Sequence, residues 1–329
     1  MTTARTVPVT TEMDGDELDA EDAWHVARRH GLRTVLVGSF VRFRYGDGFT
    51  NSRALALQAC LAVVPFLLAV MGLAADIDDD RPARVVAATV NAVSPASGDD
   101  DAIVEALAGG SEGVGEVALF LGLFFAALSM TTAMAQIERG SNRIYGIRRD
   151  RPALFKYGRA AVLTAVFAVP VGLGFLVLVA GGAFGDAMVT EYGWSDRTHA
   201  LWQWGRWPLG LLTLVVTIAV LFNHAPRRHQ PALSWLALGS GVAVVLSMTA
   251  AAGLAAYVNA SGSFSSTYGP LAGVFALLLW SLLSSISLFY GIAICAQLEA
   301  LRAGQPDPAY DDPGRPHRKT VDEGLGSDR

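Results

Sequence analysis

The chain has 329 residues, of which 52% are hydrophobic and 17% charged, and its formal net charge is −5. Soluble globular domains carry about 25% charged residues, so this composition, with its positive mean hydropathy, argues against a soluble protein. The predicted fold is an all-α integral membrane protein, because uncharged apolar runs of at least about 18 residues can cross a hydrocarbon core of roughly 30 Å as helices.

The N-terminal region divides into an acidic tail and a basic amphipathic segment. Residues 1–23 have little apolar surface to bury and are expected to be disordered. Residues 24–43 interleave apolar side chains with arginines, which fits an amphipathic helix at the membrane interface with its arginines toward anionic headgroups. The same pattern fits a helix packed on the rest of the protein, and the sequence leaves both interpretations open.

Six hydrophobic runs predict a bundle of six transmembrane helices within residues 24–303. The expected spans are about 54–75, 117–137, 160–185, 207–226, 234–258 and 270–297. The last two divide one long uncharged run at Asn259–Thr267, the part of it with turn chemistry. Pro270 then fits the first turn of the sixth helix, where its missing N–H is harmless.

Two further segments lie outside the spans. Asp76–Glu116 is a long acidic loop with two short helix candidates, one after Pro82 and one at Asp99–Asp101. Three consecutive aspartates fit a divalent-cation site, although capping of a helix start is the favoured interpretation. Residues 304–329 mix prolines with charges of both signs and are expected to be disordered.

The distribution of Lys and Arg predicts the orientation of the bundle. Six arginines between residues 28 and 53 precede the first span, seven Lys or Arg lie between the second and third spans, and two lie between the fourth and fifth, whereas the opposite loops hold four. Cytoplasmic loops carry the excess of positive charge. Both termini are therefore expected in the cytoplasm.

The spans contain small and amide side chains but almost no ionisable ones. Small residues recur every fourth position in the fifth span, as Gly239, Ala243, Ser247, Ala251 and Ala255, and predict close helix packing. Gly181 and Gly185 suggest the same for the third span. Gln58 and Gln136 are expected to form hydrogen bonds between helices. His224 is the one ionisable residue in the expected spans, which argues against a carrier built around a buried carboxylate.

Motifs of enzyme chemistry are missing from the sequence. The six histidines are scattered without metal-ligand spacing, and there is no HExxH motif and no phosphate-binding glycine loop. We therefore expect no enzymatic activity, no cofactor and no metal site. Cys60 and Cys295 both fall within expected spans, where buried hydrophobic packing is the favoured interpretation.

Four segments resemble the YihY/BrkB family of bacterial inner-membrane proteins. They are RALALQACLAVVPFLLAV, SNRIYGIRRDRP, FNHAPRRHQP and TYGPLAGVFALLLWSLLSSISLFYGIAICAQLEA, and the resemblance extends over roughly Arg33 to Leu301. It implies a six-helix, multi-pass protein of the bacterial plasma (inner) membrane, in a family linked to serum resistance and envelope lipid export. Some members carry a ribonuclease label, but this chain lacks the His/Asp cluster that a metal-dependent nuclease needs. Many members have an aromatic residue and a serine where this chain has Gln58 and Ala62.

The loop after the second span repeats the family's elements and supplies the candidate binding site. Its arginines could serve only as orientation signals, or they could bind an anionic lipid or phosphate headgroup at the cytoplasmic mouth of the bundle. The candidate site residues are Asn142, Arg143, Tyr145, Arg148, Arg149, Arg151, Tyr268, Gln58 and Gln297.

Two functions compete on this evidence. The first is a transporter or flippase-like protein for a lipid or amphiphilic envelope component. The second is a non-transporting membrane scaffold or envelope assembly partner. Expected partners are membrane lipids with anionic headgroups and no nucleic acid, while a second copy of the chain or an envelope protein is left open. A cavity open toward one leaflet would favour transport, and a solid bundle would favour a scaffold.

Overall fold

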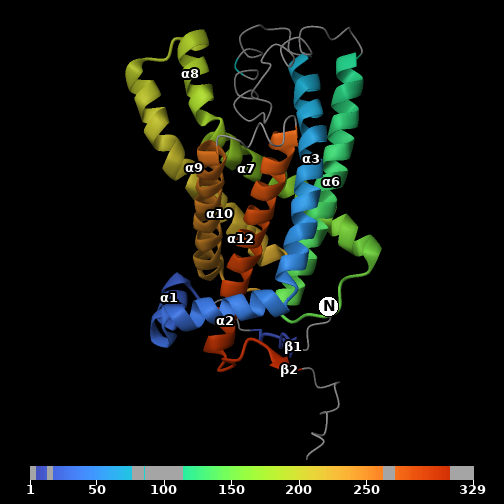
Figure 1. Cartoon of the computed structure of the whole chain (residues 1–329), viewed down its shortest axis with the longest axis vertical. Helices are drawn as coiled ribbons and strands as arrows, with labels where there is room; N and C mark the ends of the chain where they lie inside the picture. Colours follow the sequence, from blue (N-terminus) through green and yellow to red (C-terminus); the bar gives the residue numbers. More distant parts are fainter. Residues whose placement is uncertain (1–4, 13–17, 76–84, 86–113, 262–270, 312–329) are drawn as a thin grey trace, which may run out of the picture.

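The computed structural model describes residues 5–12, 18–75, 85, 114–261 and 271–311. It is a helical bundle with one short pair of strands (Figure 1). The elements are β1 (Arg5–Thr6), α1 (Ala20–His30), α2 (Leu32–Tyr45), α3 (Gly48–Ala75), α6 (Val114–Ile144), α7 (Ala153–Val179), α8 (Gly181–Tyr192), α9 (Asp196–His224), α10 (Leu233–Ser261), α12 (Ala272–Arg302) and β2 (Tyr310–Asp311).

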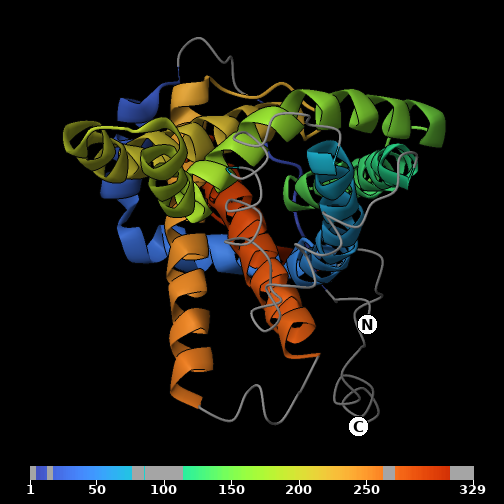
Figure 2. The ribbon, with the colours of Figure 1, turned by 90° about the horizontal axis from the view of Figure 1, so that it is seen from above.

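The long helices form the membrane-crossing part of the protein. Within the described residues, α6, α7, α9, α10 and α12 contain five segments that are long and apolar enough to cross a membrane. α3, which holds the first expected span, packs along α6 and α12. Each long helix contacts the next around the bundle, in the order α3, α6, α7, α9, α10 and α12, and α12 returns to α3. Figure 2 shows this arrangement from above.

The end of the bundle that carries α1, α2, β1 and β2 is called the basal end, and the opposite end the apical end (Figure 1). The expected single helix over residues 24–43 is in fact two helices, α1 and α2, separated at Gly31 with φ of 82°. A positive φ is easy for glycine and strained for other residues. The Asp19 side chain caps α1 by accepting from the N–H groups of Glu21 and Asp22.

α1 and α2 pack on the bundle through one face each. Ala23, Val26 and Ala27 are buried on α1, which contacts α10 and α12. Other positions on the two helices expose large apolar groups, including Trp24, Leu32 and Phe40. The packing that the sequence left open is therefore present, and contact of the exposed groups with a membrane interface stays a prediction.

The described parts of the two tails are ordered against each other, unlike the disorder that we expected. β1 pairs with β2 in antiparallel fashion, with Arg5 opposite Asp311 and Thr6 opposite Tyr310. Main-chain hydrogen bonds do not depend on apolar content, which is why composition alone misses them. Nearby, Arg302 at the end of α12 donates to the Asp22 carboxylate of α1 at 3.0 Å.

The third expected span is interrupted. α7 ends at Val179 and α8 begins at Gly181, so the glycines that we assigned to a seam in the third span belong to α8. Gly185 makes room for Trp202 of α9 and Gly181 for Arg206 of the same helix, and the Trp202 indole N–H donates to the Gly181 carbonyl at 2.6 Å. The seam exists, but it joins α8 to α9.

A close crossing lies near the basal end, between α10 and α12. A Cβ added to Gly239 would lie 2.6 Å from the Gly291 carbonyl oxygen, and one added to Gly291 would lie 2.6 Å from the Gly239 carbonyl oxygen. This confirms the expected packing at Gly239 and at the buried Ala243. This close packing does not continue toward the apical end of α10, because Ser247 and Ala251 are half-buried and Ala255 is exposed.

Packing is concentrated at the basal end. Every residue of α12 from Gly291 to Leu301 is buried, and this segment belongs to the main hydrophobic core. Over Val245–Val258 of α10, by contrast, no residue with a described side chain is buried. α10 and α12 diverge toward the apical end (Figures 1 and 2). The α10–α12 pair is thus closely packed at the basal end and separated at the apical end, whereas α3 and α6 stay in close contact at Ala69 and Gly122.

Several expectations lie outside the described residues. They are the short helices of the first external loop, Asp99–Asp101, Tyr268 and Pro270.

Candidate functional site

Glu299, in the last turn of α12, is fully buried and holds the centre of a polar cluster at the basal end. Arg228 donates from Nη2 to Glu299 Oε2 at 2.7 Å, and the Tyr145 hydroxyl donates to Glu299 Oε1 at 3.0 Å. The Arg228 guanidinium also lies 4.5 Å from the centre of the Tyr145 ring. A buried carboxylate is costly unless paired, and here two donors from different segments pair it.

Arg42 of α2 extends this cluster and is also fully buried. Its Nε donates to Gln297 Oε1 at 3.1 Å, and its Nη1 donates to Thr10 Oγ1 at 3.0 Å. Burial lowers the pKa of Arg42 to about 10. We call Arg42, Tyr145, Arg228, Gln230, Gln297 and Glu299 the basal polar cluster.

Backbone features of three connections place these side chains. Tyr145 follows the end of α6 at a turn where Gly146 has φ of 80° and where an added Cβ would collide with the Pro8 backbone. Arg228 and Gln230 come from the connection between α9 and α10. Asn142 fixes that connection, because its Oδ1 accepts from the Arg227 N–H at 2.7 Å. The N-terminal segment, the α6–α7 loop and the α9–α10 loop therefore meet around the end of α12.

A second buried carboxylate lies on α6. Glu138 pairs with Arg151 at 3.1 Å and with Arg159 at 3.3 Å, and its own side chain is only 2% exposed. Arg151 is therefore held in an ion pair inside the protein. Desolvation lowers the pKa of Arg151 from its usual value, as expected for a partly buried guanidinium.

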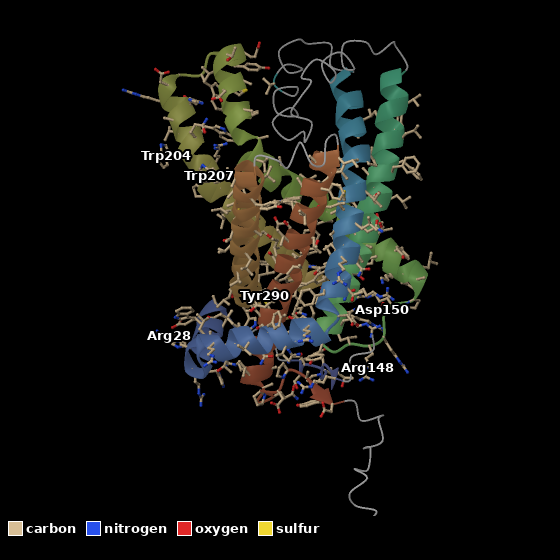
Figure 3. All side chains as sticks on the ribbon, viewed as in Figure 1. Arg28, Arg148, Asp150, Trp204, Trp207 and Tyr290 are labelled. Atoms are coloured by element: carbon tan, nitrogen blue, oxygen red, sulfur yellow. The ribbon has the colours of Figure 1, made fainter. Side chains whose placement is uncertain are left out.

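Arg148 and Arg149 lie differently, since both are exposed. They line an open groove of about 460 Å³ whose other walls are Thr6, Val7, Pro8, Val9, Gly146 and Ile147. Figure 3 shows Arg148 at the basal end of the molecule. Of the expected headgroup arginines, these two line the groove, while Arg143 does not and Arg151 is paired with Glu138.

The glutamine side chains that we singled out from the sequence lie in two different parts of the bundle. Gln58 accepts from the Thr132 hydroxyl at 2.8 Å, and Gln136 donates to Asn51 at 2.6 Å, so both join α3 to α6 as expected. Gln297 instead belongs to the basal polar cluster with Asn142 and Tyr145 nearby. The structure thus brings Asn142, Tyr145 and Gln297 to one region and leaves Gln58 apart.

The sequence analysis missed Glu299, Glu138 and Arg42 as functional candidates. Its expected spans stopped at residues 297 and 137, whereas α12 continues to Arg302 and α6 to Ile144. The signal was available for α12, because no glycine or proline follows residue 297 before Gly304, whereas α6 continues through Gly140, which lies three residues beyond its expected end. Glu138 and Glu299 lie just beyond the expected spans, so the lack of carboxylates within those spans does not extend to the basal ends of α6 and α12.

Among the described residues, no group of three or more His, Cys, Asp or Glu lies together as a metal site would require. In the basal polar cluster, the opposite charges of Arg228 and Glu299 neutralise each other inside the protein, out of contact with water. We call this closed arrangement the basal seal. Opening it would expose Arg228 and Glu299 together.

A family model described as virulence factor BrkB matches residues 39–313. The ribonuclease-like protein YfkH of Bacillus subtilis (strain 168) is 25% identical over 263 residues, which cover 79% of this chain and 93% of that protein. A UPF0761 membrane protein of Azoarcus sp. (strain BH72) is 28% identical over 180 residues, covering 55% of this chain and 42% of that protein. A UPF0761 membrane protein of Stenotrophomonas maltophilia (strain R551-3) is 25% identical over 307 residues, which cover 66% of that protein. The chain thus spans less than two thirds of the two UPF0761 proteins, and no solved structure matches it.

Proposed function

Because the chain belongs to the virulence factor BrkB family of membrane proteins, we propose that it moves a lipid or another amphiphilic envelope component across the bacterial plasma membrane. The proposal assigns no catalytic step to the chain. The observation that carries it is the contrast between the two ends of the bundle.

The basal end has the features of a closed gate. The last turns of α12 are wholly buried, and the basal polar cluster joins them to α2 and to the loops after α6 and α9. Over Val245–Val258 of α10, by contrast, no described side chain is buried, and exposed groups such as Val245 and Leu246 are apolar. A pair of helices, α10 and α12, that packs closely at one end and separates at the other suits alternating access for a molecule with a long apolar part.

We infer six membrane-crossing helices, namely α3 and the five helices α6, α7, α9, α10 and α12. The paired strands β1 and β2 lie at the same end of the bundle (Figure 1), and a chain whose two ends lie on one side must cross an even number of times. On α9, Trp204 and Trp207 lie toward the apical end, while Arg28 and Arg148 lie at the basal end (Figure 3). Tryptophan favours the interface and Arg favours the cytoplasmic side, so we place the basal end in the cytoplasm.

We also propose a headgroup contact at the basal groove beside Arg148 and Arg149. Both guanidinium groups are exposed, and a guanidinium can donate two hydrogen bonds to one phosphate. Arg143 and Arg151, which we also expected in this role, are left out because neither lines the groove.

A scaffold role is the second candidate, and the solid basal core favours it. In that case the exposed apolar groups of the apical helices would contact partner proteins, and the basal polar cluster would have no need to open. The two functions differ in whether the basal seal moves.

Lipid movement in reconstituted vesicles tests the proposal. The purified protein is placed in phosphatidylethanolamine–phosphatidylglycerol vesicles containing a fluorescent phospholipid, and a membrane-impermeant quencher reports how fast the label changes leaflet. We expect faster exchange than in protein-free vesicles, and a changed rate for Glu299→Gln, which weakens the seal. Gly241→Leu is the control, because an added Cβ there meets nothing within 4 Å. Equal rates for folded protein and protein-free vesicles, with phospholipids of either headgroup, would overturn transport of phospholipids and favour the scaffold.

A further inference from the structure

A shallow groove runs between α3 and α12 on the lateral surface of the bundle. Its volume is about 220 Å³, and its walls are Arg53, Ala56, Leu57, Phe275, Leu278, Leu279 and Leu282. Six of these seven side chains are apolar, and the seventh is a guanidinium. Leu57 and Leu279 are 52% and 40% exposed, so these two walls of the groove are open within the described residues.

The charge lies at one end of the groove. Arg53 is five residues from the basal start of α3, at Gly48, which is about 8 Å along a helix. On the antiparallel helix α12, Leu282 is the basal wall and Phe275 the apical wall, about 10 Å apart at 1.5 Å per residue. The groove therefore offers a strip of apolar surface that begins at an arginine near the membrane interface and runs toward the bilayer centre.

This arrangement matches the two parts of a phospholipid. A guanidinium near the hydrocarbon is costly when unpaired, and a phosphate at the interface would pair with it through two hydrogen bonds. None of the described residues that line the groove is a carboxylate that could neutralise Arg53. An acidic lipid supplies the missing negative charge, whereas the amine of a zwitterionic headgroup would bring a second positive charge close to the guanidinium.

We propose that the α3–α12 groove binds one acidic phospholipid, with its phosphate on Arg53 and an acyl chain along Leu57, Leu278 and Leu279. This site is separate from the basal groove at Arg148 and Arg149. It does not depend on whether the protein transports lipid.

Native mass spectrometry of the detergent-purified full chain with added phosphatidylglycerol or phosphatidylethanolamine tests the site. We expect the parent to retain phosphatidylglycerol preferentially. Arg53→Gln should weaken phosphatidylglycerol binding about tenfold and abolish the preference, and Leu278→Trp, which fills the groove, should weaken both lipids. Arg33→Gln, an exposed arginine on α2 away from the groove, should bind as the parent does. The pair Arg148→Gln and Arg149→Gln shows how much binding the basal groove contributes.

The outcomes separate the alternatives. Unchanged phosphatidylglycerol binding in Arg53→Gln, or an equal loss in Arg33→Gln, overturns the proposal. If Leu278→Trp leaves lipid binding intact but converts a dimer to a monomer, a second copy of the chain occupies the groove and the lipid proposal is wrong. Thermal unfolding of each variant identifies misfolding, and Leu57→Trp replaces Leu278→Trp if the latter does not fold.

Discussion

Arg228 and Glu299 approach from the α9–α10 connection and the last turn of α12 to form an ion pair 2.7 Å long, in which both side chains are almost wholly buried. Neither charge has access to bulk water at this position. Removing one partner of a buried pair leaves the other charge uncompensated, which costs far more than the pair itself contributes.

Arg228→Met should therefore destabilise the protein by about 3–5 kcal/mol and lower its melting temperature in detergent. Glu299→Leu should do likewise, because it leaves Arg228 buried without its carboxylate. The double variant Arg228→Met with Glu299→Leu should recover part of the loss, since no unpaired charge remains. Melting curves of the four proteins form a double-mutant cycle, and strictly additive losses would show that the pair is not coupled.

Bulk at the α10–α12 crossing should disrupt the bundle. Gly239→Leu places a side chain where a Cβ alone would meet Cys295 and the Gly291 backbone, and such overpacking typically costs about 1–3 kcal/mol or more. The matched control is Gly241→Leu on the same helix, whose Cβ position is open. Thermal unfolding in detergent should fall for Gly239→Leu alone, and equal melting of the two variants would show that the crossing does not limit stability.

Arg151 should matter for stability, whereas Arg148 and Arg149 should not. Arg151→Ala removes one of the two cations that neutralise buried Glu138, so we expect a lower melting temperature. Arg148→Ala combined with Arg149→Ala removes only exposed groups and should melt within about 0.5 kcal/mol of the parent. Scanning fluorimetry compares them, and a stable Arg151→Ala protein would contradict a structural role for that ion pair.

Labelling of single cysteines should place the two ends of the bundle on opposite sides of the membrane. In a background with Cys60→Ala and Cys295→Ala, Trp204→Cys should react with an impermeant maleimide added to intact spheroplasts. Arg148→Cys should react only after the membrane is permeabilised. The reverse pattern would invert the orientation inferred from the arginines.

The predictable features of the fold are those that arise within one helix. Gln58 and Gln136 were recognisable as polar groups in apolar helices that need a partner, and each has one across the α3–α6 contact. The contacts of Arg42 depend instead on Gln297, which is 255 residues away, and no local pattern encodes such a meeting. Tyr145 illustrates the same limit, because it was recognised as a site residue but its burial against Glu299 depends on how three loops converge.

The contacts between the two ends of the chain can form only late in synthesis, after the ribosome has made the end of α12. Arg42 is separated from Gln297 by 255 residues and Asp22 from Arg302 by 280. At about 5–20 residues per second, the ribosome takes roughly 15–55 s to deliver the second member of each pair. During that interval α2 has no α12 to dock on, and side chains that are buried in the finished fold, such as Val35 and Phe43, are available to chaperones or the lipid surface. A chain truncated before α12 would thus keep a membrane-inserted body in which α1 can still contact α10 but α2 lacks its main partner, a form that quality-control proteases could recognise.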